Sequence, residues 1–147
     1  MSFGQSFLYR ALPFLSLTPS NAMTTTSTTP TKISRPKPYL LSIEWSDGIT
    51  TTITLRAFRD ECPCASCKGE TIMGTTYSFG MQVMKPGKYE LLSIQAVGNY
   101  AIQADWKDGH NTGLYSWDIL RRITDDFALS PQQREEIERQ AASEGLA

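Results

Sequence analysis

Three cysteines lie within six consecutive residues of this sequence, at Cys62, Cys64 and Cys67. Thiolates at this spacing can converge on one cation, because the charge of the metal offsets the cost of holding negative sulfurs together. A tetrahedral site needs a fourth ligand. The only histidine of the chain, His110, directly follows an Asp-Gly turn, from which an imidazole can be aimed at a neighbouring loop. These four side chains predict one closed metal site.

Zinc is the metal that this ligand set favours, because zinc takes sulfur and nitrogen ligands in tetrahedral geometry. A site with four protein ligands usually serves structure and leaves no open position for catalysis. An iron–sulfur cluster is the alternative, although most clusters are held by four thiolates and this chain has three cysteines. Iron alone also accepts sulfur and imidazole, so the residue types do not choose between zinc and iron.

Two other interpretations of the cysteines stay open. Reduced cysteines pack in apolar turns of many proteins, and the pair Cys64 and Cys67 could serve thiol redox chemistry. The redox interpretation lacks the strand-to-helix setting that is typical of thioredoxin-like motifs. Arg56, Arg59 and Lys68 flank the loop, where they could stabilise thiolate charge through hydrogen bonds to the ligands or lie in solvent.

A β-hairpin is predicted on the N-terminal side of the cysteines. Residues 41–45 alternate apolar and polar side chains, and residues 49–55 form a run rich in Thr and Ile. Between them, Asp47 and Gly48 form a tight turn, for which glycine supplies the positive φ. The cysteines lie in the following connection, residues 56–87, which is predicted to be mostly loop.

A second predicted hairpin leads to the histidine. Residues 90–97 and 100–106 have the composition of two strands, and the turn Asp108-Gly109 precedes His110. The tetrapeptide Trp-x-Asp-Gly therefore occurs in both hairpins. A four-residue match within a turn is weak evidence for a duplication, so the match alone does not relate the two hairpins.

The rest of the chain divides into a tail and helices. Residues 1–37 are rich in Ser, Thr and Pro without periodic apolar residues, which predicts a disordered tail or a targeting segment. Residues 38–126 form the expected metal-binding domain, which ends in a helix with apolar residues at helical spacing after residue 117. Residues 127–147 predict a C-terminal helix, with Ser130 as N-cap and Gln133 closing a capping box. The expected fold is α+β: a small antiparallel hairpin sheet, a Cys-rich loop and one or two C-terminal helices.

Composition excludes several classes of function. A chain of 147 residues with a formal net charge of -1 is the size of one domain and offers no basic field for nucleic acid. The apolar stretch at residues 7–17 is interrupted by Arg10 and Pro13 and is too short to cross a bilayer. An odd number of cysteines argues against a secreted disulfide framework. We therefore expect a cytoplasmic protein without nucleic-acid or membrane partners, or an organelle protein if residues 1–37 are a transit peptide.

The order of the motifs resembles that of a known family. The residues that carry the resemblance are Trp45-x-Asp47-Gly48, Leu55-Arg56, Cys62-Pro63-Cys64-Ala65-x-Cys67, Val97-Gly98-x-Tyr100-Ala101, Trp106-x-Asp108-Gly109-His110 and Gly113-x-Tyr115. Over residues 39–124 they are similar to the gamma-butyrobetaine hydroxylase-like N-terminal domain family. In the hydroxylases this domain resembles a zinc module with three cysteines and one histidine, which correspond here to Cys62, Cys64, Cys67 and His110. Many stand-alone members look as if they lack the cysteines.

The resemblance also bears on activity and partners. A 2-oxoglutarate-dependent iron site needs two histidines and a carboxylate, and a chain with one histidine cannot build it, so we expect no enzyme activity. A similar domain ends a chloroplast P-loop scaffold protein of iron–sulfur assembly, which keeps a cluster carrier or assembly accessory as the alternative function. The expected function is a zinc-binding accessory or interaction domain. Its expected protein partner is an iron–sulfur assembly P-loop ATPase or an oxygenase.

Overall fold

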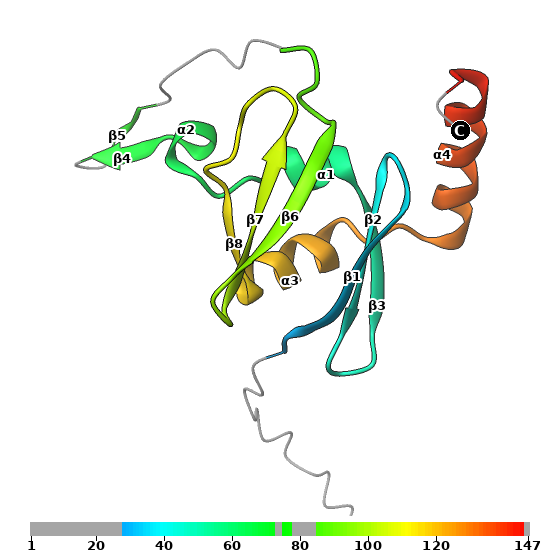
Figure 1. The fold of residues 1–147 in the computed structure, drawn as a ribbon, viewed down its shortest axis with the longest axis horizontal. Coiled ribbons are helices and arrows are strands. Elements are labelled where there is room, and N and C mark those ends of the chain that lie inside the picture. The colour runs from blue at the N-terminus through cyan, green and yellow to red at the C-terminus, as the bar shows by residue number, and fades with distance from the viewer. Residues whose placement is uncertain (1–27, 73–74, 78–84, 146–147) are drawn as a thin grey trace, which may run out of the picture.

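The computed structural model describes residues 28–72, 75–77 and 85–145. These residues form three small antiparallel sheets and helices, as Figure 1 shows, so the predicted α+β class is confirmed. The tail or targeting segment predicted for the start of the chain lies, up to residue 27, outside the described residues. Among the described residues, no helix is long and apolar enough to span a membrane.

The first sheet has the order β1-β2-β3, with strands β1 (Pro30–Lys37), β2 (Leu40–Trp45) and β3 (Thr50–Thr54). Alternation along β2 buries Leu41, Ile43 and Trp45 on one side. Helix α1 (Leu55–Asp60) follows β3 directly, and its N-cap Thr54 accepts a hydrogen bond from the backbone of Ala57 over 3.1 Å. The predicted hairpin is therefore present, extended by one strand on its N-terminal side.

Strand β1 corrects the boundary predicted for the tail. The polar composition and two prolines of residues 30–37 predict that they belong to the tail. In the structure they form a strand that pairs with β2, with Ile33 opposite Ile43. The register shifts between Pro30 and Lys32 and again between Ser34 and Lys37. An outer strand with prolines and bulges has little periodicity, which is why the sequence pattern did not reveal it.

The second sheet has the order β6-β7-β8, with strands β6 (Leu91–Val97), β7 (Ala101–Trp106) and β8 (Leu114–Ser116). Helix α3 (Trp117–Asp126) follows β8 directly and buries Leu120, Ile123 and Thr124. Both elements of the second predicted hairpin are therefore present, and α3 is the helix expected after residue 117.

The two halves of the domain repeat the same order of elements, three antiparallel strands followed by a helix. The middle strands β2 and β7 have the same pattern of buried and half-buried residues along their length. In each half the first helical residue donates its N–H to the carbonyl of a tyrosine before the middle strand. Leu55 donates to Tyr39 over 2.9 Å, and Trp117 donates to Tyr100 over 3.0 Å.

The two Trp-x-Asp-Gly turns match in the same way. The tryptophan N–H donates to the carbonyl four residues further on, Trp45 to Ile49 over 2.8 Å and Trp106 to His110 over 3.0 Å. Both turn glycines have a positive φ, 83° and 85°, where other residues are strained. His110 therefore occupies the position in the second half that Ile49 occupies in the first. These shared hydrogen bonds relate the two turns, which the four-residue sequence match alone could not do.

The two halves enclose one hydrophobic core. The ring of Phe58 from α1 stacks on Tyr115 from β8, with centroids 4.3 Å apart, and lies 5.8 Å from the ring of Trp106. Stacked and tilted aromatic pairs of this kind add to the stabilisation from buried area. The core also contains these buried residues from both three-stranded sheets, from the helices and from the connection after α1: Leu41, Ile43, Trp45, Ile53, Leu55, Cys62, Leu91, Ile102, Ala104, Leu120 and Ile123.

The remaining elements lie outside this repeat. The connection after α1 contains α2 (Ala65–Lys68) and a two-stranded sheet of β4 (Glu70–Ile72) and β5 (Thr75–Tyr77). The C-terminal helix α4 (Pro131–Ser143) has the predicted capping box, in which Ser130 Oγ accepts from the Gln133 N–H over 3.2 Å. Ala141 is buried in α4, and the rest of the helix is largely polar and exposed.

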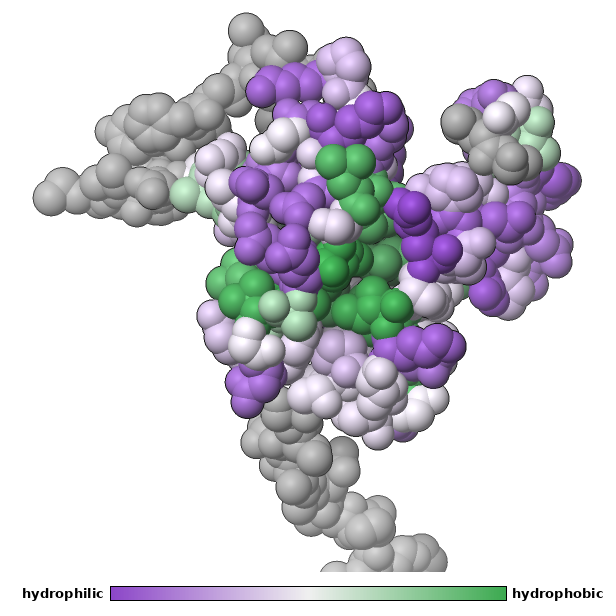
Figure 2. Space-filling view, viewed as in Figure 1, coloured by the Kyte–Doolittle hydropathy of each residue, from purple (hydrophilic) through white to green (hydrophobic). Residues whose placement is uncertain are grey.

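One outer strand of each three-stranded sheet, β1 in the first and β6 in the second, borders a groove. Arg35 on β1 spans it by donating from Nη1 to the carbonyl of Leu91 over 2.7 Å. Apolar side chains gather on this face, as Figure 2 shows. Ile33, Ile94 and Ile102 are among the residues that line the groove.

Candidate metal centre

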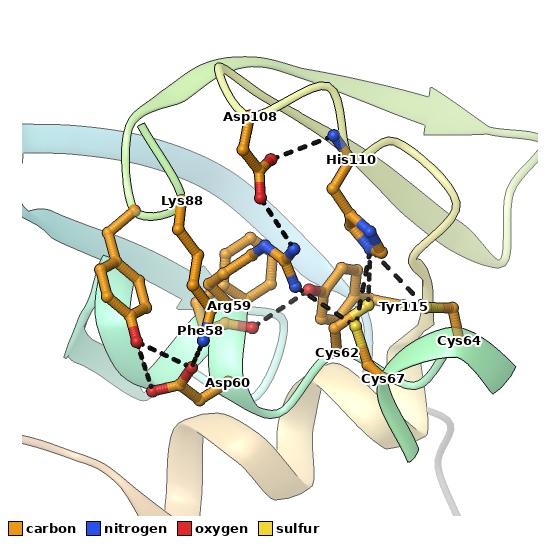
Figure 3. Close-up of polar contacts among 11 residues, drawn as sticks. Phe58, Arg59, Asp60, Cys62, Cys64, Cys67, Lys88, Asp108, His110 and Tyr115 are labelled. Atoms are coloured by element: carbon orange, nitrogen blue, oxygen red, sulfur yellow. Dashed lines mark hydrogen bonds and ion pairs between the residues drawn. The ribbon is translucent and has the colours of Figure 1, made fainter. Parts of the chain in front are cut away.

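The three cysteines are positioned by the end of α1 and the start of α2. The backbone N–H of Cys62 donates to the carbonyl of Arg59 over 3.3 Å, which turns the chain away from α1. Cys64 is the N-cap of α2, and its carbonyl accepts the N–H groups of Cys67 and Lys68, each over 3.0 Å. This turn brings the three sulfurs together below the imidazole, as Figure 3 shows. All three cysteines are free thiols, with Cys62 fully buried and the other two half-buried.

Two hydrogen bonds to the backbone of His110 fix its position in the hairpin turn. Its N–H donates to Asp108 Oδ1 over 3.0 Å, and its carbonyl accepts from the Trp106 N–H over 3.0 Å. The Asp-Gly turn between them fixes the direction of the chain. The ring consequently points its Nε2 atom at the cysteine loop (Figure 3).

The distances among the four side chains match those of a mononuclear tetrahedral site. The Nε2 atom of His110 lies 3.2 Å from Cys62 Sγ, 3.6 Å from Cys64 Sγ and 3.9 Å from Cys67 Sγ. One ligand atom from each of the four residues lies within 4.8 Å of every other. With Zn–S near 2.3 Å and Zn–N near 2.0 Å, a tetrahedron would separate sulfur from nitrogen by about 3.5 Å. The structure therefore brings together all four residues that the sequence singled out, in a group that could hold a metal ion.

The imidazole can bind a metal without losing a proton, whereas the buried Cys62 thiol must first lose its own. Burial lowers the pKa of His110, helped by the charge of Arg59, so the imidazole is neutral near pH 7 and its lone pair is available. Burial also raises the pKa of Cys62 to about 12. Burial acts to raise the pKa of Cys64 too, but hydrogen bonds with Thr112 and the other two cysteines outweigh it and lower that pKa.

One of the three basic residues that flank the loop contacts a ligand. Arg59 donates from Nη1 to Cys67 Sγ over 3.3 Å. Lys68 instead pairs with Glu61 over 2.7 Å, and Arg56 lies 3.9 Å from an oxygen of Asp60 near the surface. The sequence could name Arg59 as a candidate but could not separate it from its two neighbours.

Gly113 leaves room for the Cys62 sulfur, a role that sequence reasoning missed. A Cβ atom at residue 113 would lie 2.7 Å from Cys62 Sγ and 3.1 Å from the Tyr115 ring, and both of these side chains are fully buried. We expect Gly113→Ala to displace the sulfur, to lower zinc affinity about tenfold and to cost about 1–3 kcal/mol of stability through overpacking. Competition with a chromophoric chelator and denaturant unfolding measure the two effects.

Gly48→Ala is the matched control for this substitution. A Cβ at residue 48 meets no atom within 4 Å, so its cost is backbone strain at a φ of 83°. Both variants should lose stability, and only Gly113→Ala should lose zinc affinity. Wild-type zinc affinity in Gly113→Ala would show that the sulfur of Cys62 is not a ligand in the position described.

Comparisons with known proteins identify the family and the fold. A family model described as gamma-butyrobetaine hydroxylase-like, N-terminal, matches residues 32–121. A crystal structure of a protein of unknown function in the DUF971 family, from Acidithiobacillus ferrooxidans, is 30% identical. It aligns over 65% of this chain and 92% of its own, with a TM-score of 0.45. A protein solved by NMR in solution is 22% identical over 82% of this chain and 86% of its own, and its TM-score of 0.52 indicates the same fold. No curated protein sequence matches the chain significantly.

Proposed function

Because this chain belongs to the gamma-butyrobetaine hydroxylase-like, N-terminal family, we propose that it is a non-catalytic accessory or interaction domain that binds one zinc ion. The proposed ligands are Cys62, Cys64, Cys67 and His110. The observation that carries this proposal is the convergence of their four ligand atoms within 4.8 Å from two segments far apart in the sequence. In this role the metal would join the cysteine loop to the second hairpin and stabilise the domain.

The spacing of the ligands favours a single ion over an iron–sulfur cluster. A cluster distributes its ligands over different iron atoms, so thiolates bound to different irons stand further apart than thiolates that share one ion. Here all four ligand atoms are close enough to share one ion. Zinc suits this set of three thiolates and one neutral imidazole. The alternative function, a carrier or assembly accessory for iron–sulfur clusters, would require the loop to open.

The non-catalytic role and the partner rest on the family and the residue inventory. Four protein ligands leave a tetrahedral ion no open position for substrate, and an oxygenase iron site would need a second histidine that the chain lacks. Members of the family are named for their place at the N-terminal side of a hydroxylase. We therefore propose a protein partner of the oxygenase class, with an iron–sulfur assembly P-loop ATPase as the second choice. Three free cysteines fit a reducing compartment, so we also propose a cytoplasmic location.

Elemental analysis of the purified protein tests the choice of metal. We expect a colourless protein with one zinc per chain and no sulfide. A brown protein that contains iron and acid-labile sulfide would replace this proposal by the cluster carrier. One iron per chain without sulfide would keep the site and change its metal.

Substitution of the histidine tests the ligand set. His110→Ala removes one of four ligands, and because structural zinc sites bind with roughly 10–16 kcal/mol in total, one ligand accounts for about 3 kcal/mol, or roughly a hundredfold in affinity. The control is Ile49→Ala, which changes the equivalent position of the other hairpin. Zinc affinity measured by chelator competition should fall in His110→Ala and stay unchanged in Ile49→Ala. Equal zinc affinity in the two variants would show that His110 is not a ligand.

A further inference from the structure

We infer that Arg59 and Asp108 form a buried clamp that positions two of the metal ligands, so that the site is assembled before the metal arrives. This inference rests on the proposed function, because it assigns these two residues to the same metal site. Neither residue would touch the metal. They are positioning residues, which act through the ligands that they hold.

The clamp connects the two segments that supply the ligands. Arg59 donates from Nη1 to Cys67 Sγ over 3.3 Å and from Nη2 to Asp108 Oδ2 over 3.1 Å. The other oxygen of Asp108 accepts the backbone N–H of His110 over 3.0 Å. One guanidinium and one carboxylate thus form a continuous path from the cysteine loop to the histidine, which Figure 3 shows.

The clamp is protected from water, which makes it rigid. The side chains of Arg59 and Asp108 are each 6% exposed, and the guanidinium lies 5.8 Å from the ring centre of Trp106. Removing either partner would leave the other charge buried and uncompensated, so the pair resists opening. A planar guanidinium can donate to a sulfur and a carboxylate at once, whereas the compact ammonium of lysine cannot span both in the same way.

The other half of the domain contains a corresponding pair without any metal ligand, and this pair is more exposed, at 22% for Arg121 and 35% for Asp47. Asp47 accepts the N–H of Ile49 over 3.0 Å and a hydrogen bond from Arg121 Nη1 over 2.7 Å. Arg121 lies 5.2 Å from the ring centre of Trp45. It is the fifth residue of α3, as Arg59 is the fifth residue of α1. The arginine of each half therefore binds the Trp-x-Asp-Gly turn of the other half: Arg59 binds Asp108, and Arg121 binds Asp47.

The pair of Asp47 and Arg121 shows that this pattern of hydrogen bonds also occurs where no metal ligands are present. The turn held by Arg121 is followed by Ile49, whereas the turn held by Arg59 is followed by His110. All three cysteines of the chain lie in the connection that follows α1. The clamp with Asp47 therefore forms with no ion to organise it. The clamp with Asp108 has the same pattern of hydrogen bonds between arginine, aspartate and turn backbone, and it adds a hydrogen bond to Cys67 that its counterpart does not have.

The test compares Arg59→Met with Arg121→Met, using cobalt(II) alone as the probe. Both variants lose a clamp, and only the first should lose affinity, by about 10- to 100-fold, as is typical when a partner of a metal ligand is removed. Because Arg59→Met also removes the N–H···S bond to Cys67, its sulfur-to-cobalt charge-transfer band should move to longer wavelength. Arg121→Met should leave the band and the affinity unchanged although it destabilises the fold.

Hydrogen exchange of the metal-free protein gives a second readout. The amide of His110 should be protected in the wild type before any metal is added, and it should lose protection in Arg59→Met while the amide of Ile49 keeps it. If Arg59→Met does not fold, Arg59→Lys and Asp108→Asn take its place, with Arg121→Lys and Asp47→Asn as their controls. These milder changes should weaken cobalt binding by a smaller factor in the same direction.

The outcomes distinguish the inference from the proposed function. Failure of the wild-type protein to bind cobalt overturns both. Normal binding by the wild type together with unchanged affinity and spectrum in the Arg59 and Asp108 variants overturns the clamp and leaves the metal site intact. Equal losses in the Arg59 and Arg121 variants also overturn it, since the effect would then come from general destabilisation.

Discussion

Loading the metal-free protein with zinc is expected to raise its free energy of unfolding by about 4 kcal/mol at a free zinc concentration of about 1,000 times Kd. The reason is that the ion binds the folded chain, in which four ligand atoms lie within 4.8 Å, far more tightly than the unfolded chain. For a chain of 147 residues the midpoint of thermal unfolding should rise by roughly 10 to 25 °C. Calorimetry or denaturant unfolding in zinc buffers measures the change.

The dependence on zinc concentration provides the control for this result. Stabilisation should grow with the logarithm of free zinc, and magnesium, which prefers oxygen ligands, should have no effect. The double variant Cys64→Ser with Cys67→Ser should not respond to zinc. A zinc-independent midpoint in the wild type would mean that the four residues meet without binding an ion.

Zinc affinity is expected to increase at least tenfold for each unit rise in pH between about pH 6.5 and about pH 8, because Cys62 by itself releases one proton on binding. Burial raises the pKa of Cys62 to about 12, so this thiol is protonated in the metal-free protein throughout that range. Zinc binds the thiolate, and binding must therefore release the proton. Lower pH favours the protonated metal-free form, so affinity falls as pH falls.

Calorimetric titrations in buffers of different ionisation enthalpy count the released protons directly. His110 should contribute no proton at pH 7, because burial lowers the pKa of the imidazole below its ordinary value of 6.5. The variant His110→Ala should consequently release the same number of protons as the wild type while binding more weakly. A zinc affinity that does not change with pH would show that zinc binding does not release the proton of Cys62.

The features that sequence reasoning predicted correctly are local ones, with one exception. The hairpin turns follow from Asp-Gly dipeptides, whose glycine adopts the positive φ that the turn needs. The capping box of α4 follows from Ser130 and Gln133, three residues apart. The one long-range feature among them is the approach of His110 to the three cysteines, which was expected because the chain has a single histidine to complete a set of four ligands.

The features that sequence reasoning missed depend on contacts between distant residues. Arg59 and Asp108 are 49 residues apart, and no local pattern distinguishes a buried ion pair from two surface charges. The same applies to Gly113, whose importance lies in the approach of a sulfur from another segment. The sequence indicated the internal repeat only through the shared Trp-x-Asp-Gly tetrapeptide, because the two halves share hydrogen bonds and burial patterns more than residue types. Structure was therefore needed to show which residues support the predicted ligands.

The irregular outer strands have a consequence for how the protein behaves at high concentration. Unpaired backbone groups at a sheet edge can recruit the same edge of another molecule and start fibrous assembly. Strand β1 interrupts such pairing with two register shifts, and β6 has one between Leu91 and Ser93. Arg35 additionally occupies the carbonyl of Leu91. These irregularities hinder edge-to-edge pairing at β1 and β6, two of the four outer strands of the three-stranded sheets. The sequence that hid β1 from prediction therefore also makes it a poor template for another strand.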